Sequence, residues 1–391
     1  MSQAVKVGFV SLGCPKNQLD AEVMLHELYD AGFEIVSEDI DADVVIVNTC
    51  AFIESAKQES IDNIIDIGWL KKNRQLKGIV VTGCLAERYR DAIFDELPEV
   101  DAVLGVGSIH DIVNAVKSAA KGKRYSSYLD KDCVALGGER IITTPEYYAY
   151  LKIAEGCDNR CTYCAIPNIR GRFRSRPMDE LIDEAKVLEG LGVKELVIVA
   201  QDTTKYGVDL YGEYKLAELI HKISEATTIP WLRVLYCYPD KITDELIDEF
   251  RTNPRLVKYI DLPIQHISEN ILRRMNRHGG SDVVRSAITR LRDLPDMVIR
   301  TTVICGFPGE TEADFEELCE FIKETRFDRL GAFAYSREED TPAYDFADQV
   351  DEQIKQDRVD IVMAEQSRIS DELNQKKIGK VLEVISEGWD E

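Results

Sequence analysis

The sequence predicts an α/β protein built from two successive runs of alternating strands and helices. Short runs rich in Val and Ile, such as Asp43–Asn48 (DVVIVN), alternate with helical patterns such as Leu19–Ala31. Strands joined through helices pair in parallel with right-handed crossovers, and uniformly apolar strands of this kind are buried on both faces. At 391 residues the chain is too long for one ordinary domain, so we expect two or three.

The first run predicts a parallel, Rossmann-like domain over residues 1–125. Its expected strands are Val5–Leu12, Asp43–Asn48 and Lys77–Thr82, and its expected helices are Leu19–Ala31 and Ser55–Lys71. Each strand is followed by a cysteine, at Cys14, Cys50 and Cys84. Because parallel strands end at the same edge of a sheet, where open α/β sheets bind ligands, we expect these cysteines to meet at one edge.

The second run predicts a partly open barrel of six βα units over residues 146–340, because six units are fewer than the eight of a closed barrel. Its expected strands are Tyr148–Ala154, Glu195–Ala200, Trp231–Tyr236, Lys258–Leu262, Val298–Ile304 and Gly331–Tyr335. Its expected helices are Met178–Gly190, Tyr214–Ala226, Thr243–Phe250, Glu269–Met275 with Asp282–Arg292, and Glu312–Glu324. Between the two runs, residues 126–145 lack a clear pattern and are predicted to be a linker.

The C-terminal residues carry a charged helical pattern that ends in one apolar run. We expect a helical connector over residues 341–377 and a strand at Gly379–Ser386 (GKVLEVIS). One strand cannot form a domain. Residues 378–391 are therefore predicted either to begin a small β-barrel that is cut short or to pair with another sheet.

Charge and cysteine content limit the classes of protein to which the chain can belong. The formal net charge is −23, from 71 acidic and 48 basic residues, which argues against a large nucleic-acid surface and suits a basic partner, although acidity also serves solubility alone. Residues 1–14 lack the features of a signal peptide, and no apolar run is long enough to span a bilayer, so we expect a cytoplasmic protein without a membrane partner. In that compartment, clustered cysteines more often bind metal than form disulfides.

A second cysteine set forms the tight motif Cys157-Asp-Asn-Arg-Cys161-Thr-Tyr-Cys164. These gaps let one loop wrap a four-iron cubane, with three thiolates serving three irons and the fourth iron open to another ligand. A zinc site is the alternative, but zinc usually takes four ligands from separate pairs, and no fourth cysteine or histidine follows nearby. The motif therefore predicts an iron–sulfur site.

This loop, with Tyr163 before its last cysteine, resembles the radical S-adenosylmethionine superfamily. The resemblance implies a [4Fe–4S] cluster on Cys157, Cys161 and Cys164, with S-adenosylmethionine bound to its open iron. Val303–Glu310 (VICGFPGE) is similar to the superfamily's adenosyl-binding segment, in which a small residue lets the ligand approach the backbone. The cofactor-binding residues implied in this way are Tyr163, Gln201, Asp202, Gln265, Ile304 and Gly306.

The whole chain resembles the methylthiotransferase family of radical enzymes. In that family Cys14, Cys50 and Cys84 hold a second, auxiliary [4Fe–4S] cluster that carries the sulfur to be inserted, and a small C-terminal β-barrel binds the substrate. The resemblance implies an electron donor of the flavodoxin or ferredoxin type. Because the target carbon is unactivated, acid–base catalysis cannot reach it, and no catalytic acid or base is expected.

Three segments are similar to the branch of this family that modifies a ribosomal protein: Ser11–Asn17 (SLGCPKN), Leu235–Pro239 (LYCYP) and Pro263–Ser268 (PIQHIS). This branch adds a methylthio group to the β-carbon of an aspartate in the twelfth protein of the small subunit, a post-translational modification. The other branch modifies an adenosine in transfer RNA and remains the alternative. Net charge favours the basic ribosomal protein, with nucleic acid met only through the ribosome.

A two-cluster electron-transfer protein is the alternative from a different class. Electron carriers generally ligate each cluster with four cysteines, whereas both sets here have three, which favours catalysis.

The sequence leaves alternative roles open for several residues. The arginines of Ile169–Pro177 (IRGRFRSRP) either grip a carboxylate or phosphate or lie on an exposed charged loop; they are Arg170, Arg172, Arg174 and Arg176. A lone His266 is more often structural than catalytic. We expect no role for Cys133 and a packing role for Cys237, Cys305 and Cys319.

Overall fold

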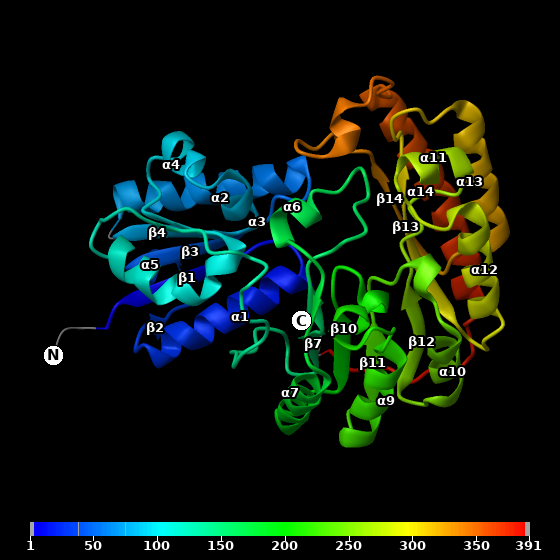
Figure 1. The fold of residues 1–391 in the computed structure, drawn as a ribbon, viewed down its shortest axis with the longest axis horizontal. Coiled ribbons are helices and arrows are strands. Elements are labelled where there is room, and N and C mark those ends of the chain that lie inside the picture. The colour runs from blue at the N-terminus through cyan, green and yellow to red at the C-terminus, as the bar shows by residue number, and fades with distance from the viewer. Residues whose placement is uncertain (1–3, 38, 75, 388–391) are drawn as a thin grey trace. The chain divides into compact units, whose positions relative to one another are not determined.

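The computed structural model describes residues 4–37, 39–74 and 76–387, and the chain divides into two compact units. The first unit comprises Met1–Thr143, Glu155–Asp158 and Cys164–Arg174. The second comprises Thr144–Ala154, Asn159–Tyr163 and Ser175–Glu391. Each unit is built around its own sheet (Figure 1).

The first unit is a six-stranded parallel sheet in the order β2-β1-β3-β4-β5-β6. The strands are β1 (Lys6–Ser11), β2 (Glu34–Ile35), β3 (Val44–Thr49), β4 (Gly78–Gly83), β5 (Ala102–Leu104) and β6 (Tyr125–Ser127). The helices are α1 (Pro15–Asp30), α2 (Glu54–Asn73), α3 (Cys84–Tyr89), α4 (Ala92–Glu96), α5 (Ile112–Ala119) and α6 (Ile166–Arg170), with 3-10 turns at Asp39–Asp41 and Val106–Asp111. The predicted parallel α/β domain is confirmed.

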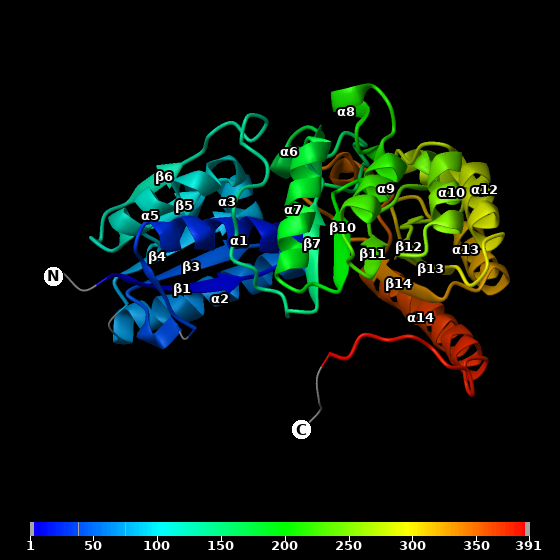
Figure 2. The same cartoon turned by 90° about the horizontal axis from the view of Figure 1, so that it is seen from below.

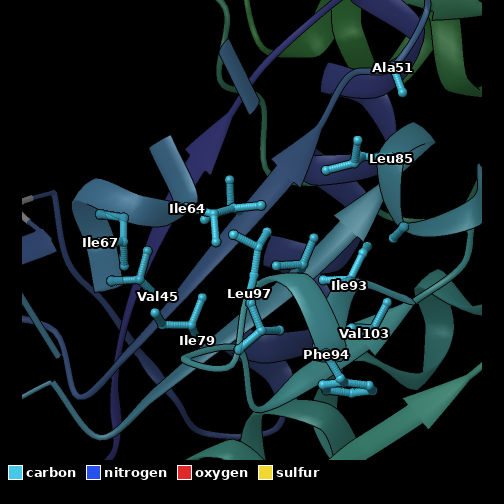
Figure 3. Close-up of a cluster of buried hydrophobic side chains, with 14 of the residues drawn as sticks. Val45, Ala51, Ile64, Ile67, Ile79, Leu85, Ile93, Phe94, Leu97 and Val103 are labelled. Atoms are coloured by element: carbon cyan, nitrogen blue, oxygen red, sulfur yellow. The ribbon is translucent and has the colours of Figure 1, made fainter. Parts of the chain in front are cut away.

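Both faces of this sheet are buried, as the uniformly apolar strands require. On one face, alternate strand residues such as Val45 and Ile79 pack with Ile64 of α2 and Phe94 of α4 (Figure 3). On the other face, their neighbours in the strands pack with residues of α1 and α5, including Met24. A fully buried aliphatic side chain contributes about 1.5–3 kcal/mol, so these two layers are the main source of stability for the unit.

The second unit is a six-stranded parallel sheet in the order β14-β13-β12-β11-β10-β7, with helices covering its outer face (Figure 2). Its strands are β7 (Tyr148–Lys152), β10 (Glu195–Val199), β11 (Trp231–Val234), β12 (Leu256–Asp261), β13 (Val298–Cys305) and β14 (Arg329–Ala334). Its helices are α7 (Met178–Gly190), α8 (Val208–Tyr211), α9 (Leu216–Ala226), α10 (Asp244–Thr252), α11 (Glu269–Arg274), α12 (Gly280–Arg292), α13 (Glu312–Thr325) and α14 (Glu352–Gln375). The short strands β8 (Ala154–Glu155) and β9 (Arg174–Ser175) form a separate two-stranded sheet, and 3-10 turns lie at Thr203–Lys205, Pro239–Lys241 and Pro342–Asp345.

The sequence does not indicate three strands of the first sheet. β2, β5 and β6 have only two or three residues each, too few for a period-2 pattern, and β6 extends into the predicted linker 126–145. Each becomes a strand because it pairs in parallel with a longer neighbour or, for β6, with β5. Sheet context, rather than local preference, decides these segments.

The predicted strand at Gly379–Ser386 is wrong. After α14 the described residues 380–387 form no helix or strand, and Val381, Leu382 and Val384 are exposed. An apolar run becomes a strand only when another strand pairs with it, and the described part of the chain supplies none. The last residues of the predicted barrel, 388–391, lie outside the described residues. Among the described helices, none combines the length and apolar character needed to cross a bilayer.

Candidate functional site

Cys14, Cys50 and Cys84 lie at the carboxyl ends of three adjacent parallel strands. The order of the first sheet places β1, β3 and β4 side by side. Cys14 lies between β1 and α1, Cys50 follows β3 directly, and Cys84 is the first residue of α3 after β4. The expectation that one sheet edge carries all three cysteines is therefore confirmed. We call this edge the cysteine rim, meaning Cys14, Cys50, Cys84 and the loops that carry them.

Two glycines allow the loops of the cysteine rim to approach each other. Gly13 has φ +96°, and a Cβ there would lie 3.0 Å from the Cβ and 3.3 Å from the Sγ of Cys50. Gly83 has φ +89°, and a Cβ there would lie only 2.5 Å from the carbonyl oxygen of Thr49. Glycine is favoured at both positions because it tolerates positive φ and leaves this space free.

Asn17, in the first turn of α1, ties two of the rim loops together. Its Nδ2 donates hydrogen bonds to the carbonyl oxygens of Leu12 (2.7 Å) and Thr49 (3.3 Å). Its own carbonyl oxygen accepts a hydrogen bond from Nδ2 of Asn48 at 2.8 Å. Asn17 is 1% exposed, so these bonds replace water for backbone groups that would otherwise be buried without partners.

The thiols of the cysteine rim are buried next to one arginine. Burial raises the pKa of the Cys84 thiol to about 11, against the opposing charge of Arg170, whose Nη2 lies 3.5 Å from Cys84 Sγ. Burial also raises the pKa of Cys50, and the Cys14 thiol adds to that shift. Buried thiols need a cation before they become thiolates at neutral pH, and a metal ion or cluster supplies one.

One buried hydroxyl near the rim also suits a bound iron–sulfur group. Oγ1 of Thr82, two residues before Cys84, is buried without a hydrogen-bond partner among the described residues. Buried polar atoms of this kind normally have a partner, and a hydroxyl can donate to a sulfide. Elsewhere in the described part of the chain, ligand atoms of the largely exposed trio His26, Asp30 and Glu139 all lie within 4.8 Å of one another.

The CxxxCxxC loop connects β8 to α6, and its cysteines fall in both units. Cys157 and Cys164 belong to the first unit and Cys161 to the second. In the first unit, the backbone N–H of Cys157 donates to the carbonyl oxygen of Gly171 at 3.2 Å. A Cβ at Gly156 (φ +78°) would lie 2.0 Å from the Arg172 carbonyl oxygen, so the turn that presents Cys157 requires glycine.

In the second unit, Cys161 lies beside Tyr238 and the buried Arg277. The hydroxyl of Tyr238 is 3.7 Å from Cys161 Sγ, and Nη1 of Arg277 is 4.0 Å from it. The guanidinium of Arg277 also lies 4.1 Å from the ring centroid of Tyr238, a cation–π contact. Tyr238 belongs to the segment LYCYP noted above, whereas no sequence signal marks Arg277.

Asp202 holds the CxxxCxxC loop through Asn159. Asp202 is fully buried, and its carboxylate accepts hydrogen bonds from Asn159 Nδ2 (2.7 Å) and Thr204 Oγ1 (2.7 Å). Lys241 Nζ lies 3.1 Å from this carboxylate and 3.1 Å from Asn159 Oδ1. Because the carboxylate is occupied in this way, we interpret Asp202 as a positioning residue for the loop.

The other residues implied to bind the cofactor lie at the carboxyl edge of the second sheet. Half-buried Gln201 follows β10, and Gln265, with φ +71°, follows β12 and bridges to Val303 of β13. Tyr163 and Ile304 pack against the same small apolar cluster, which contains Ile271, Met275, Phe307, Tyr335 and Ala343.

Gly306 follows β13, and the structure gives a reason for glycine at this position that differs from the expected one. With φ +73°, a Cβ there would lie 2.2 Å from Cγ of Lys355 on α14, so the close neighbour is a protein side chain. The Gly306 N–H donates to Oε2 of Glu310 at 2.9 Å.

His266 has a structural environment. It is fully buried, its Nδ1 accepts from the Ser268 N–H at 3.0 Å, and its Nε2 lies 3.4 Å from Oε2 of Glu310. The acceptor role of Nδ1 places the proton on Nε2, facing the carboxylate. The structural interpretation of His266 fits this geometry.

The arginines after the CxxxCxxC loop are mostly internal. Arg170 and Arg176 are buried, and Arg176 pairs with Glu184 at 2.6 Å. Half-buried Arg174 donates to the carbonyl oxygens of Val134 and Lys131, both at 2.6 Å. Only Arg172 of the four is exposed. An exposed charged loop is therefore the wrong description of this run, and three of its guanidinium groups have protein partners.

The other cysteines lie apart from both motifs. Cys237 and Cys305 are fully buried, Cys319 is half-buried, and Cys133 is exposed, with its Sγ 3.5 Å from Oδ2 of Asp130.

Comparison with known protein families agrees with this division of the chain. Residues 6–105 match the family model described as "Uncharacterized protein family UPF0004", and residues 151–322 match the Radical SAM superfamily. These two ranges contain the cysteine rim and the CxxxCxxC loop, respectively.

Whole-chain relatives decide the family. The chain is 49% identical to "Ribosomal protein uS12 methylthiotransferase RimO" of Thermoanaerobacter sp. strain X514 over 98% of its length and 88% of the relative's. It is 51% identical to the protein of the same name from Caldanaerobacter subterraneus subsp. tengcongensis, and 50% identical to that from Clostridioides difficile, with 98% of this chain and 88% and 87% of those relatives covered. The chain belongs to the RimO family of radical-SAM methylthiotransferases.

A solved structure shows the same fold at much lower sequence identity. The radical S-adenosylmethionine methyltransferase TsrM from Kitasatospora setae matches with a TM-score of 0.64 at 15% identity, covering 87% of this chain and 77% of that one. At this identity the likeness concerns the fold alone. Membership of the RimO family confirms the predicted methylthiotransferase class, and the radical-SAM domain implies a [4Fe–4S] cluster and S-adenosylmethionine.

Proposed function

We propose that this chain adds a methylthio group to the β-carbon of an aspartate in ribosomal protein uS12. The observation that carries this proposal is the identity of about half of all residues, across 98% of the chain, with enzymes named for that substrate. The net charge of −23 supports it independently, because an acidic surface attracts a basic ribosomal protein and repels the phosphates of transfer RNA. A ribosomal substrate places this activity in the cytoplasm.

We further propose two [4Fe–4S] clusters with separate ligand sets. Cys14, Cys50 and Cys84 hold the auxiliary cluster, and Cys157, Cys161 and Cys164 hold the cluster that binds S-adenosylmethionine. Support for the first set comes from the convergence of its loops at Gly13 and Asn17. When bound, these groups supply the sulfur and the one-electron chemistry needed to replace hydrogen on an unactivated carbon.

The chain's own residues orient these groups and exclude water. Asn159, held by Asp202 and Lys241, fixes the middle of the CxxxCxxC loop. The residues proposed to contact S-adenosylmethionine are Tyr163 of the CxxxCxxC loop and, at the carboxyl ends of strands in the second sheet, Gln201, Gln265, Ile304 and Gly306. We assign no general acid or base, because hydrogen removal from an unactivated carbon needs none.

Substrate docking and electron supply complete the proposed function. We propose that a small C-terminal β-barrel contributes to substrate docking and that a flavodoxin or ferredoxin supplies electrons. Both proposals are supported by the family resemblance.

Mass spectrometry of the reaction product tests the proposed function. Anaerobically reconstituted enzyme, S-adenosylmethionine and a reductant are incubated with purified uS12 and, separately, with unmodified transfer RNA. The expected product is a methylthio group on one aspartate of uS12 and none on RNA. Methylthio product on transfer RNA with none on uS12 would assign the chain to the other substrate while leaving the enzyme class unchanged.

A further inference from the structure

Arg170 is a buried cation at the cysteine rim. It is 3% exposed and ends α6, in the segment directly after Cys164. Its Nη2 lies 3.5 Å from Cys84 Sγ, within the range of an N–H···S hydrogen bond, and donates to Asn17 Oδ1 at 3.0 Å. Asn17 in turn holds the loops of Cys14 and Cys50. One guanidinium thus contacts a proposed cluster ligand and the residue that orders the rim.

Two carboxylates fix this guanidinium in place. Nη1 of Arg170 lies 2.5 Å from Oδ2 of Asp20 and 3.5 Å from Oε2 of Glu155, and both carboxyl groups are buried. The surrounding segment is equally fixed, because Ala165 and Ile169 belong to the apolar core of the first unit. A guanidinium held so rigidly cannot turn away from the sulfur when the charge at the rim changes.

We propose that Arg170 is a positioning residue that sets the reduction potential of the auxiliary cluster, by donating an N–H···S hydrogen bond to Cys84. This inference rests on the proposed assignment of Cys14, Cys50 and Cys84 as cluster ligands. The inference goes beyond the ligand assignment because Arg170 is not itself an iron ligand. The carboxylates of Asp20 and Glu155 keep Arg170 in place and moderate its charge without cancelling its directed hydrogen bond.

The physical reason is electrostatic. Reduction adds a negative charge to a cluster, and hydrogen bonds to its thiolate sulfurs stabilise the reduced state and raise the potential. The effect is large where water is excluded, because charges interact more strongly at low effective dielectric. Cys84 is 5% exposed, so water does not replace the hydrogen bond when it is removed.

The same run of arginines supplies a matched control. Arg176 is also buried and also paired with a carboxylate, that of Glu184 at 2.6 Å, but its other partner is the carbonyl oxygen of Lys152 rather than a sulfur. Replacing Arg176 therefore removes a buried guanidinium of similar structural importance from the second unit. It should not change the potential of a cluster in the first.

The experiment is a redox titration monitored by electron paramagnetic resonance. It uses the full chain carrying Cys157→Ala, Cys161→Ala and Cys164→Ala, so that only the auxiliary cluster is present. In this background we compare Arg170→Gln, Arg170→Lys and Arg176→Gln. For Arg170→Gln we expect the reduced-to-oxidised ratio at a fixed potential to fall by about tenfold, which is about 59 mV for one electron. Arg170→Lys, which keeps the charge but not the fork of donors, should shift less, and Arg176→Gln should not shift.

Iron content separates failure of this inference from failure of the ligand assignment. If the background protein with native Arg170 binds no iron, the assignment of the rim cysteines is wrong. If it binds iron, and Arg170→Gln and Arg170→Lys retain both the iron and the native potential, the proposed role of Arg170 is overturned. Loss of iron from both variants, with native circular dichroism, would also overturn it, because Arg170 would then serve cluster assembly instead of its potential. An equal shift in Arg176→Gln would show that the effect is not directed at the sulfur.

Discussion

Replacing Asn17 should open the cysteine rim while leaving the rest of the first unit folded. Asn17→Ala removes two hydrogen bonds to backbone carbonyl oxygens, at Leu12 and Thr49, and the acceptor of one bond from the charged Arg170. A neutral buried bond contributes about 1 kcal/mol and one to a charged group about 1.5–3 kcal/mol. The rim should therefore be destabilised by about 4 kcal/mol, or about a thousandfold in the equilibrium for local opening.

Amide hydrogen exchange of the iron-free chain measures this local opening directly. We expect exchange at the ends of β1 and β3 to accelerate by about a thousandfold, whereas exchange in the second unit stays unchanged. Asn63→Ala is the control, because the Nδ2 of half-buried Asn63 donates to the carbonyl oxygen of Glu59 within α2 and not to a rim loop. Unchanged protection at the rim in Asn17→Ala, or the same acceleration in Asn63→Ala, would refute this account of how the three loops are held.

Three further predictions follow from other parts of the molecule. Gly306→Ala should lower the melting temperature by several degrees and weaken S-adenosylmethionine binding, both measured by calorimetry. The reason is that a Cβ at φ +73° would lie 2.2 Å from Lys355 Cγ and displace it. An unchanged melting temperature would show that the Lys355 side chain moves aside at little cost. Serine at Cys237 or Cys305 should leave iron content unchanged, although burial of a hydroxyl without a partner should cost about 1–3 kcal/mol of stability; loss of iron would mean that the ligands are wrongly assigned. Binding of uS12 should weaken as ionic strength rises, and salt-independent binding would argue against recognition through the acidic surface.

The sequence was sufficient to predict the parallel strands and the edge at which the three rim cysteines meet. Cysteines after β1, β3 and β4 must share an edge, because parallel strands joined by right-handed crossovers end on the same side. This reasoning needs only strand order and position. It therefore succeeds for Cys14, Cys50 and Cys84, which are far apart in the sequence.

Contacts between side chains could not be predicted in this way. Arg170 is one of four similar arginines in the sequence, and only packing shows that it is directed to Asp20 and Cys84 and not to solvent. Asp202 is predicted to contact the cofactor, and the contacts of its carboxylate with Asn159 and Lys241 have no signal in the sequence. These pairings depend on three-dimensional neighbours that have no fixed spacing along the chain.

At the C-terminal end the error is the opposite one, because local sequence preference predicts a strand that the structure does not contain among the described residues. The apolar run at Gly379–Ser386 has the composition of a strand, yet Val381, Leu382 and Val384 are exposed and the run pairs with no described strand. β6, which lies in a segment of weak pattern, is a strand because β5 pairs with it. Strand formation is decided by the available partner, which a single sequence does not reveal.

Iron content after anaerobic reconstitution tests the central claim most directly, which is that one chain holds two independent three-cysteine cluster sites. The native chain should bind about eight irons per molecule, as two cubanes. Replacing Cys157, Cys161 and Cys164 by alanine should leave about four and abolish S-adenosylmethionine cleavage, whereas replacing Cys14, Cys50 and Cys84 should leave about four with cleavage still detectable. Full iron content in the second triple variant would contradict the account, because it would show that the cysteine rim holds no cluster.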